Sequence, residues 1–388
     1  MTDLIRFDTH VMLVSRQPSP NLIPALDPRL KPRAVVMLVT PDMVQQGDWL
    51  RDVLQPAGIK VSQVTLPDPY DVPAMRDQVL NVVSDREAES LVLNATGGTK
   101  LMAIAAYEVF SSAGLPVFYV HPDEDRLIWL YPYDKPTFTL ANQIRLPVFL
   151  RAHGTTVVDR PAHYGVQQVV RDLAKTLVLN VATFQSALRT LNFLAATAAN
   201  SPQLRSKPLG HALRDPHLGA LLEQFESAEL LTIEQDCLRF ADESARFFAN
   251  GGWLEQYVYS VVQSLKAETT VIQDIGRGLD VTRSQKGQPV KNELDVVFLA
   301  RNRLYIVECK TRQFKDEKGP VGAGPGAEAL YKLEALRGLL GGLQAKAMLV
   351  SYQPLTNDVL DRARNYRIKT CDGAQLDQLG EQLQAWME

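Results

Sequence analysis

Two acidic residues and a lysine lie close together on either side of a short polar break. Residues 292–299 and 304–310 are rich in β-branched and aromatic types, and the short segment Ala-Arg-Asn-Arg at 300–303 separates them. This pattern predicts an antiparallel hairpin. Because side chains alternate faces along a strand, Glu308 and Lys310 share one face.

The register of this hairpin decides which acidic groups meet. If the turn is centred between Arg301 and Asn302, Asp295 lies opposite Glu308. A two-residue or four-residue loop gives this register, whereas a three-residue loop turns Asp295 to the other face. We therefore expect two carboxylates directly across from each other.

Opposed carboxylates repel unless positive charge lies between them. A divalent cation with hard oxygen ligands satisfies this need, and Lys310 adds a fixed charge where a phosphodiester under attack becomes more negative. Asp295, Glu308 and Lys310 thus predict a metal-dependent phosphodiesterase centre. The alternative is a half-exposed strand with surface charges. The apolar flanks favour a buried hairpin, in which stray charge is costly.

The bulk composition bounds the architecture. At 388 residues the chain is long enough for two or three domains. Its 46% hydrophobic and 22% charged residues are typical of a soluble globular protein, and the net charge of -3 gives no overall nucleic-acid signature. The three cysteines show no zinc or disulfide spacing, and there is no signal segment or membrane-length apolar run. We expect a cytoplasmic protein with no membrane contact.

The first third alternates buried strands with helices, which indicates a parallel, doubly wound α/β sheet. Strands are expected at 10–15, 34–39, 60–66, 90–94 and 116–120, with an antiparallel addition at 126–131. The segment 94–102 reads NATGGTKLM, so a strand runs through two glycines into a helix. Glycines permit a sharp turn, and a helix N-terminus offers N–H groups to an anion. Neither the Walker A nor the dinucleotide pattern is met, and this motif alone fits a ligand site or a structural turn equally.

The remaining chain has two further parts. Helical spacing over 165–199 and 218–225, a loop over 202–216 and a hairpin over 230–240 predict a winged-helix-like linker that transmits dimer geometry. A helix with Glu255, a strand at 271–275, the hairpin, a helix at 327–338 and a strand at 347–351 then predict the last domain. The Gly-rich segment 319–326 is either a substrate-side loop or a flexible connection.

The segment 94–102, with the loop 15–21, resembles the CRISPR-associated Rossmann fold (CARF) sensor domain. That family binds cyclic oligoadenylates made by type III CRISPR complexes. The resemblance implies a homodimer in which each chain contributes a turn to one ring-shaped ligand. It implies a ligand site at the carboxyl ends of the strands, formed by Ser15, Gln17, Asn21, Thr40, Thr96, Gly97, Gly98, Thr99, Lys100 and Met102.

The order of elements in the last domain is similar to the PD-(D/E)XK nuclease core, with Glu-Leu-Asp standing where that family often has Pro-Asp. The resemblance implies that Asp295, Glu308 and Glu255 bind Mg²⁺ or Mn²⁺. The Cys309 carbonyl is implied as a further metal ligand. Lys310 would orient the attacking water or stabilise the pentacovalent phosphorus.

Together these resemblances predict a CARF sensor over 1–150, a linker over 151–250 and a nuclease over 251–388. The predicted function is a metal-dependent endonuclease that cleaves RNA or DNA in type III CRISPR antiviral defence. A cyclic oligoadenylate is expected to activate it, and the cyclic tetra-adenylate is the expected ring. Ligand binding would rotate or close the nuclease domains. Two alternatives stay open: a ligand-responsive DNA-binding regulator without nuclease activity, and a ring nuclease that degrades its own ligand. RNA against single- or double-stranded DNA, and Mg²⁺ against Mn²⁺, also stay open.

Overall fold

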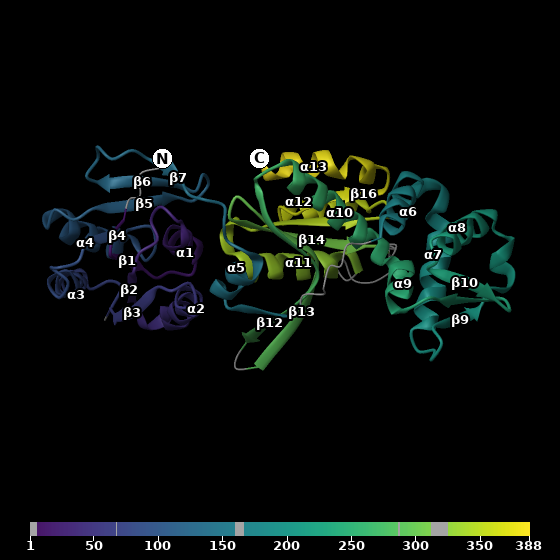
Figure 1. Cartoon of the computed structure of the whole chain (residues 1–388), viewed down its shortest axis with the longest axis horizontal. Helices are drawn as coiled ribbons and strands as arrows, with labels where there is room; N and C mark the ends of the chain where they lie inside the picture. Colours follow the sequence, from purple (N-terminus) through teal and green to yellow (C-terminus); the bar gives the residue numbers. More distant parts are fainter. Residues whose placement is uncertain (1–5, 67, 160–166, 286–287, 312–324) are drawn as a thin grey trace.

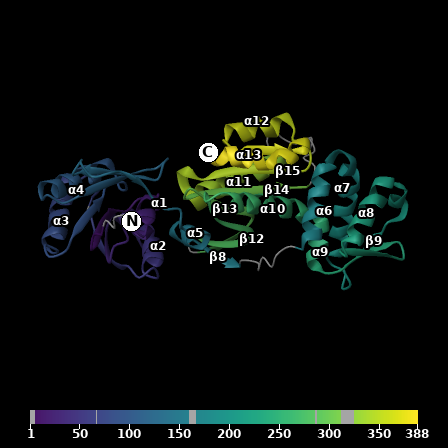
Figure 2. The ribbon, with the colours of Figure 1, turned by 45° about the horizontal axis from the view of Figure 1, so that its top comes forward.

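The computed structural model describes residues 6–66, 68–159, 167–285, 288–311 and 325–388. These residues form a seven-stranded, a three-stranded and a six-stranded sheet. The six-stranded sheet lies in the middle of the elongated molecule, although most of its strands come last in the sequence (Figures 1 and 2). Within the described chain, no helix combines the length and the apolar character needed to cross a membrane.

The seven-stranded sheet has the order β3-β2-β1-β4-β5-β6-β7, in which the first five strands are parallel and β6 is antiparallel to β5. This confirms the predicted doubly wound sheet and its antiparallel addition. Its elements are β1 (Thr9–Leu13), α1 (Ser19–Leu26), β2 (Ala34–Val39), α2 (Val44–Leu54), β3 (Lys60–Thr65), α3 (Val72–Ser84), β4 (Leu91–Asn94), α4 (Lys100–Ser112), β5 (Val117–His121), β6 (Arg126–Tyr131) and β7 (Phe138–Thr139).

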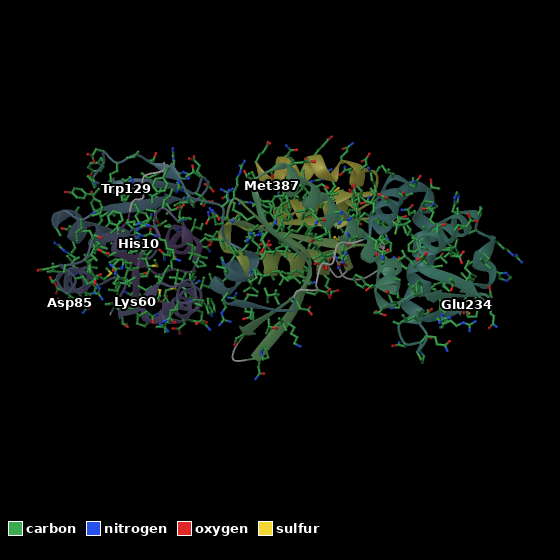
Figure 3. All side chains as sticks on the ribbon, viewed as in Figure 1. His10, Lys60, Asp85, Trp129, Glu234 and Met387 are labelled. Carbon is green, nitrogen blue, oxygen red and sulfur yellow. The ribbon has the colours of Figure 1, made fainter. Side chains whose placement is uncertain are left out.

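Central strands of this sheet are buried on both faces, as continuous apolar runs require. All five residues of β1 are buried, and even His10 is only 1% exposed. Figure 3 labels His10 among the side chains of this sheet. Burial lowers the pKa of His10 to about 3, so the imidazole is neutral. β1 lies between β2 and β4, which makes the gap between β1 and β4 the switch point of the sheet.

The middle segment is helical with a small sheet of order β10-β11-β9. The predicted hairpin is present as β10 and β11, but the predicted loop over 202–216 was wrong in part, because β9 pairs with β11 there. The elements are α6 (Gln168–Leu179), α7 (Val181–Ala198), β9 (Arg205–Pro208), α8 (Pro216–Ser227), β10 (Leu231–Glu234), β11 (Cys237–Phe240) and α9 (Glu243–Phe247).

The six-stranded sheet has the order β16-β15-β14-β13-β12-β8. One strand differs from expectation: β8, which falls in the predicted linker, pairs with β12 at the edge of this sheet. The elements are α5 (Leu146–Ala152), β8 (Thr155–Asp159), α10 (Trp253–Glu268), β12 (Ile272–Gln285), β13 (Gln288–Ala300), β14 (Arg303–Lys310), α11 (Pro325–Gly341), β15 (Lys346–Ser351), α12 (Asn357–Asn365), β16 (Lys369–Asp372) and α13 (Leu379–Met387).

Two hydrophobic cores cross between the three sheets. One lies on the face of the six-stranded sheet covered by α10 and α13, and it continues into helices α6, α7 and α8 of the middle segment. The other lies under α11 and α12 and runs through α5 into the core of the seven-stranded sheet. Each neighbouring unit is therefore packed onto the central sheet through apolar side chains.

Candidate active site and sensor turn

The hairpin of β13 and β14 has the predicted register. The two strands pair from Ala300–Arg303 at the turn to Val296–Val307. Arg301 and Asn302 form the turn and have φ values of 48° and 55°. Two successive left-handed residues are the signature of the hairpin turn whose twist matches that of the strands. The two-residue loop places Asp295 and Glu308 on neighbouring strands, as the sequence predicts.

The backbone pairing between β13 and β14 ends at Val296, and Asp295 is the next residue along β13. Its Oδ2 accepts a hydrogen bond from the Cys309 backbone N–H at 2.7 Å. This bond holds the Asp295 carboxylate against β14, beside Glu308. The Cys309 thiol is buried and belongs to the core on the α10 side of the sheet, on the face opposite to the carboxylate of Glu308.

Glu308 is the most buried member of the group, with 2% of its surface exposed. Its Oε1 lies 2.6 Å from the Lys310 Nζ and 3.3 Å from the Lys332 Nζ. Lys332 is a charged group that the sequence analysis did not assign. It belongs to α11, where Leu330 and Leu333 face the core, and this register turns Lys332 toward β14. Helical spacing could indicate its helix face, but not which strand that face covers.

The carboxylates interact strongly. Burial and the Glu308 charge raise the pKa of Asp295 to about 7, although the Cys309 N–H and both lysines act in the opposite direction. Burial, followed by the charges of Asp295 and Glu293, raises the pKa of Glu255 on α10 to about 8. Three acidic groups from α10, β13 and β14 therefore lie near enough for their charges to interact in a partly water-excluded site.

This site fits a hard divalent cation by its chemistry. Its acidic groups offer only oxygen donors, and they repel one another in the absence of positive charge. Across the described ranges, no three His, Cys, Asp or Glu side chains are close enough to form a metal cage on their own. Residues 319–324 of the Gly-rich segment lie outside the described part of the chain.

The predicted sensor turn lies at the switch point between β1 and β4. A Cβ on Gly97 would lie 2.0 Å from the Leu13 carbonyl oxygen, so only glycine permits this approach to β1. Gly98 has a φ of 71°, and the Thr99 Oγ1 accepts from the Met102 N–H at the start of α4. Lys100 follows on the exposed surface.

Two predicted ligand residues, Asn21 and Thr96, are held inside the protein by hydrogen bonds. The Asn21 Nδ2 donates to the Leu13 carbonyl at 2.8 Å, and the Asn94 Nδ2 donates to the Asn21 Oδ1 at 3.1 Å. The Thr96 Oγ1 donates to the Asn94 Oδ1 and accepts from the Val120 N–H. These bonds fix the loop after β1 and the turn after β4 relative to each other.

The other predicted ligand residues differ in exposure. Thr40 is 3% exposed and Met102 is 2% exposed, so both side chains are buried. Ser15 and Gln17 are half-buried and line a cavity against the six-stranded sheet. All ten residues lie in the loops and helix starts that follow β1, β2 and β4, and their contacts with a ligand remain a prediction.

A Rossmann-like sensor joined to a sheet with this carboxylate and lysine group defines a CARF-linked nuclease. Comparison with known families agrees: residues 9–148 match the Card1 CARF domain, and residues 242–388 match the Card1-like endonuclease domain. The chain belongs to the Card1-like family. It carries an endonuclease domain of that kind and is a nuclease.

Solved structures of similar proteins cover nearly the whole chain. Protein VC1899 from Vibrio cholerae is 30% identical, with 98% of this chain and 97% of that chain covered and a TM-score of 0.90. Can2 from Sulfobacillus thermosulfidooxidans, solved in complex with cyclic tetra-adenylate, is 27% identical, with 98% and 99% covered and a TM-score of 0.79. A comparison with curated proteins gave no match.

A third structure shares the fold. It is a type III CRISPR defence DNA nuclease activated by cyclic oligoadenylate, 20% identical to this chain, with a TM-score of 0.56. The alignment covers 90% of this chain and 47% of that one.

Proposed function

We propose that this protein is a metal-dependent endonuclease of type III CRISPR antiviral defence, and that cyclic tetra-adenylate switches it on. The observation that carries the proposal is the pairing of Asp295, Glu308 and Lys310 in a Card1-like endonuclease fold that shares a hydrophobic core with a CARF sensor. The similarity to Can2, solved with cyclic tetra-adenylate, supports the choice of activator.

In this proposal Asp295, Glu308, Glu255 and the Cys309 carbonyl hold Mg²⁺ or Mn²⁺. The ion, when bound, polarises the phosphodiester and makes a bound water acidic. Lys310 places its ammonium where negative charge develops on the phosphorus oxygens. Burial alone would lower the Lys310 pKa, but the neighbouring Glu308 and Asp295 raise it overall, so the side chain stays charged.

We propose the division into a sensor at 1–150, a linker at 151–250 and a nuclease at 251–388, with β8 of the linker segment completing the nuclease sheet. The ligand would lie at the carboxyl ends of β1, β2 and β4, against the turn 96–100. Its binding would change the arrangement of the nuclease domains through its higher affinity for one arrangement. The three described cysteines are free, as is usual in the reducing cytoplasm, where we place the protein.

We also propose a homodimer formed through the sensor. Helix α4 begins at the sensor turn and leaves Leu101 and Ile104 exposed by 38% and 59%. The double variant Leu101→Asp, Ile104→Asp should be monomeric in analytical ultracentrifugation and should bind the ring at least tenfold more weakly, because one ring needs two turns. Leu213→Asp, at a residue 46% exposed in the middle segment, should stay dimeric. A double variant that remains a dimer would contradict this interface.

One assay tests the whole proposal. Purified protein is incubated with cyclic tri-, tetra- and hexa-adenylate, with labelled single- and double-stranded RNA and DNA, and with Mg²⁺, Mn²⁺ or EDTA. We expect cleavage only with the tetra-adenylate and a divalent ion, and none with EDTA. Loss of the ring without cleavage of the polymers would instead indicate a ring nuclease, and ring-dependent binding of duplex DNA without cleavage would indicate a regulator.

A further inference from the structure

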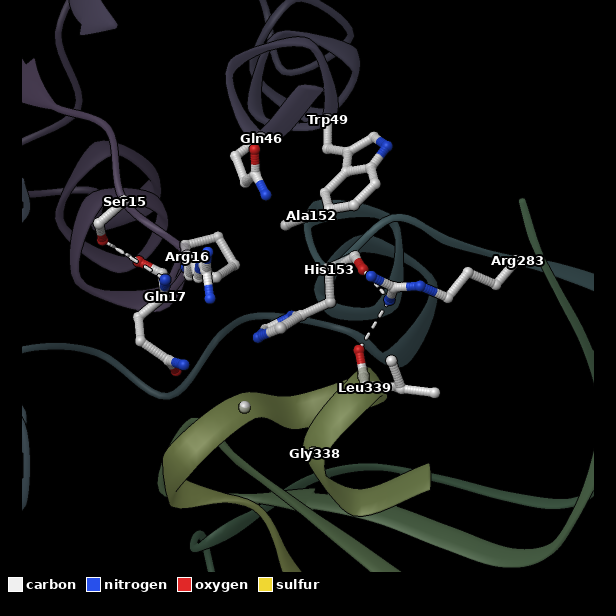
Figure 4. A pocket seen from close by; sticks show the side chains of 12 residues that line it. Ser15, Arg16, Gln17, Gln46, Trp49, Ala152, His153, Arg283, Gly338 and Leu339 are labelled. Atoms are coloured by element: carbon white, nitrogen blue, oxygen red, sulfur yellow. Dashed lines mark hydrogen bonds between the residues drawn. The ribbon is translucent and has the colours of Figure 1, made fainter. Parts of the chain in front are cut away.

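A cavity of about 380 Å³ lies between the sensor and the nuclease (Figure 4). The sensor contributes Arg16, Gln17, Gln46 and Trp49, while His153 and Arg283 come from the other side. Two guanidinium groups therefore face the cavity, and none of its described lining residues is acidic. This balance favours an anionic occupant.

His153 supplies a hydrogen-bond acceptor to this cavity. Its side chain is 5% exposed, and its Nδ1 lies 2.9 Å from the Phe149 carbonyl oxygen. A carbonyl only accepts, so Nδ1 carries the proton. Burial lowers the pKa of His153 to about 4, which leaves the ring neutral and Nε2 as a bare acceptor. In Figure 4 the ring points into the cavity, and Nε2 has no partner within the described ranges.

Gln46 supplies a donor from the sensor side, because in Figure 4 its amide nitrogen points toward the cavity and its oxygen points away from it. Its Oε1 is buried and has no partner among the residues that the structure describes. The bare Nε2 of His153 on the opposite wall needs a donor hydrogen from an occupant, because unpaired buried polar atoms are costly. The amino group of adenine and a ribose hydroxyl are donors of this kind.

Arg283 joins three elements around the cavity. Its Nη1 donates to the His153 carbonyl at 2.5 Å and to the Leu339 carbonyl of α11 at 2.8 Å. Its guanidinium lies 5.0 Å from the centre of the Trp49 ring on α2. A phosphate bound here would therefore engage a side chain that already links the sensor to the end of α11.

The sensor loop also touches the nuclease directly. The Gln17 Oε1 accepts from the Leu343 N–H at 3.3 Å, in the turn that follows α11. Gly342 in that turn has a φ of 65°, and a Cβ there would collide with the Gln17 amide. Lys332 of α11 forms an ion pair with Glu308. A movement of the Gln17 loop that displaces the end of α11 would therefore also affect the active site.

We propose that this cavity binds an adenylate unit, whose phosphate meets Arg16 and Arg283 and whose amino or hydroxyl donor meets His153. Occupancy then ties the sensor loop to α11 and thereby to the nuclease centre. This inference rests on the proposed activation by an adenylate ring, and it adds ligand contacts from the nuclease side of the molecule. The adenylate can belong to the cyclic activator or to a free nucleotide such as ATP.

The test measures binding of cyclic tetra-adenylate and of ATP to the full-length protein by calorimetry. His153→Asn keeps a donor at the place of Nδ1 and removes the acceptor, and it should weaken binding about tenfold. Arg283→Gln removes a charged partner of phosphate and should weaken binding about tenfold to a hundredfold. Arg16→Gln, an exposed rim variant that leaves the interior intact, should weaken binding severalfold. Arg214→Gln, exposed in the middle segment, should bind like the wild type.

Ring analogues separate a ligand contact from a folding defect. A cyclic tetra-inosinate ring lacks the amino group, and a 2′-fluoro ring lacks the ribose hydroxyl. One of the two should bind equally to wild type and His153→Asn, which identifies the donor and supports the cavity site. If the wild type binds both rings more tightly than His153→Asn does, the proposed His153 contact is overturned.

The remaining outcomes separate this inference from the proposed function. If the wild type is activated by the ring while all three cavity variants bind it with wild-type affinity, the inference is overturned and the proposed function stands. If no ring binds to or activates the wild type, the proposed function fails. ATP binding that depends on His153 and Arg283 would then still support the site, and its absence would overturn that too.

Discussion

Replacement of Glu308 by alanine abolishes cleavage, by a factor on the order of 10³, while binding of the cyclic activator persists. Glu308 is 2% exposed and joins Lys310 and Lys332 at one carboxylate, so its loss removes a metal ligand and leaves two ammonium groups without their common partner. The measurement is a cleavage rate at saturating activator, together with a separate calorimetric affinity. Glu308→Gln keeps the shape of the side chain and should show the same loss of rate.

Lysine variants refine this expectation. Lys310→Ala should lose cleavage to a similar extent, because its Nζ lies 2.6 Å from the carboxylate. Lys332→Ala should lose less, because its side chain is 40% exposed and its Nζ lies 3.3 Å away. Undiminished cutting by the Glu308 or Lys310 variants, with unchanged melting temperatures, would contradict the assignment.

Replacement of Gly97 by alanine removes the response to the activator and leaves the nuclease fold intact. The new Cβ would lie 2.0 Å from the Leu13 carbonyl oxygen, so the turn after β4 must move away from β1 and from the loop that Asn21 anchors. We expect activator affinity to fall about a hundredfold or more, since the proposed ligand contacts lie on both sides of that gap. Titration of activator against cleavage rate measures this.

The matched control for that variant is Gly219→Ala in α8. Gly219 has open space around its Cβ position, and alanine is favoured inside a helix. This control should be activated like the wild type. A Gly97→Ala protein that still responds at wild-type ligand concentrations would remove the turn from the sensor site.

Much of the nuclease site could be predicted because its determinants are local. The alternation of side chains and the length of the Arg301–Asn302 turn fix the faces and register of the hairpin, and thereby the closeness of Asp295 and Glu308. The sensor turn is local as well, because strand, glycines and helix start follow one another directly. The chemistry of the carboxylates and of the glycine turn could be predicted because the residues concerned are close together in the sequence.

Contacts between distant segments could not be predicted in this way. Lys332 reaches Glu308 only because α11 packs across β14, and nothing in the spacing of its own helix specifies that strand. Edge strands β8 and β9 are short, and their pairing depends on partners far along the chain. No sequence motif surrounds His153 or Arg283. They line a common cavity only because the sensor packs against the nuclease.

Helix α5 has a consequence for how the protein unfolds. Phe149 and Leu150 of this helix are at most 1% exposed and belong to the apolar cluster that runs from the sensor strands to β14. If the chain were divided beside this helix, both fragments would expose apolar surface that is buried in the intact protein. Neither fragment would retain its full stability. Sensor and nuclease should therefore melt together in calorimetry, and an exchange of sensors between relatives should succeed only when the crossover carries α5 along with its neighbours.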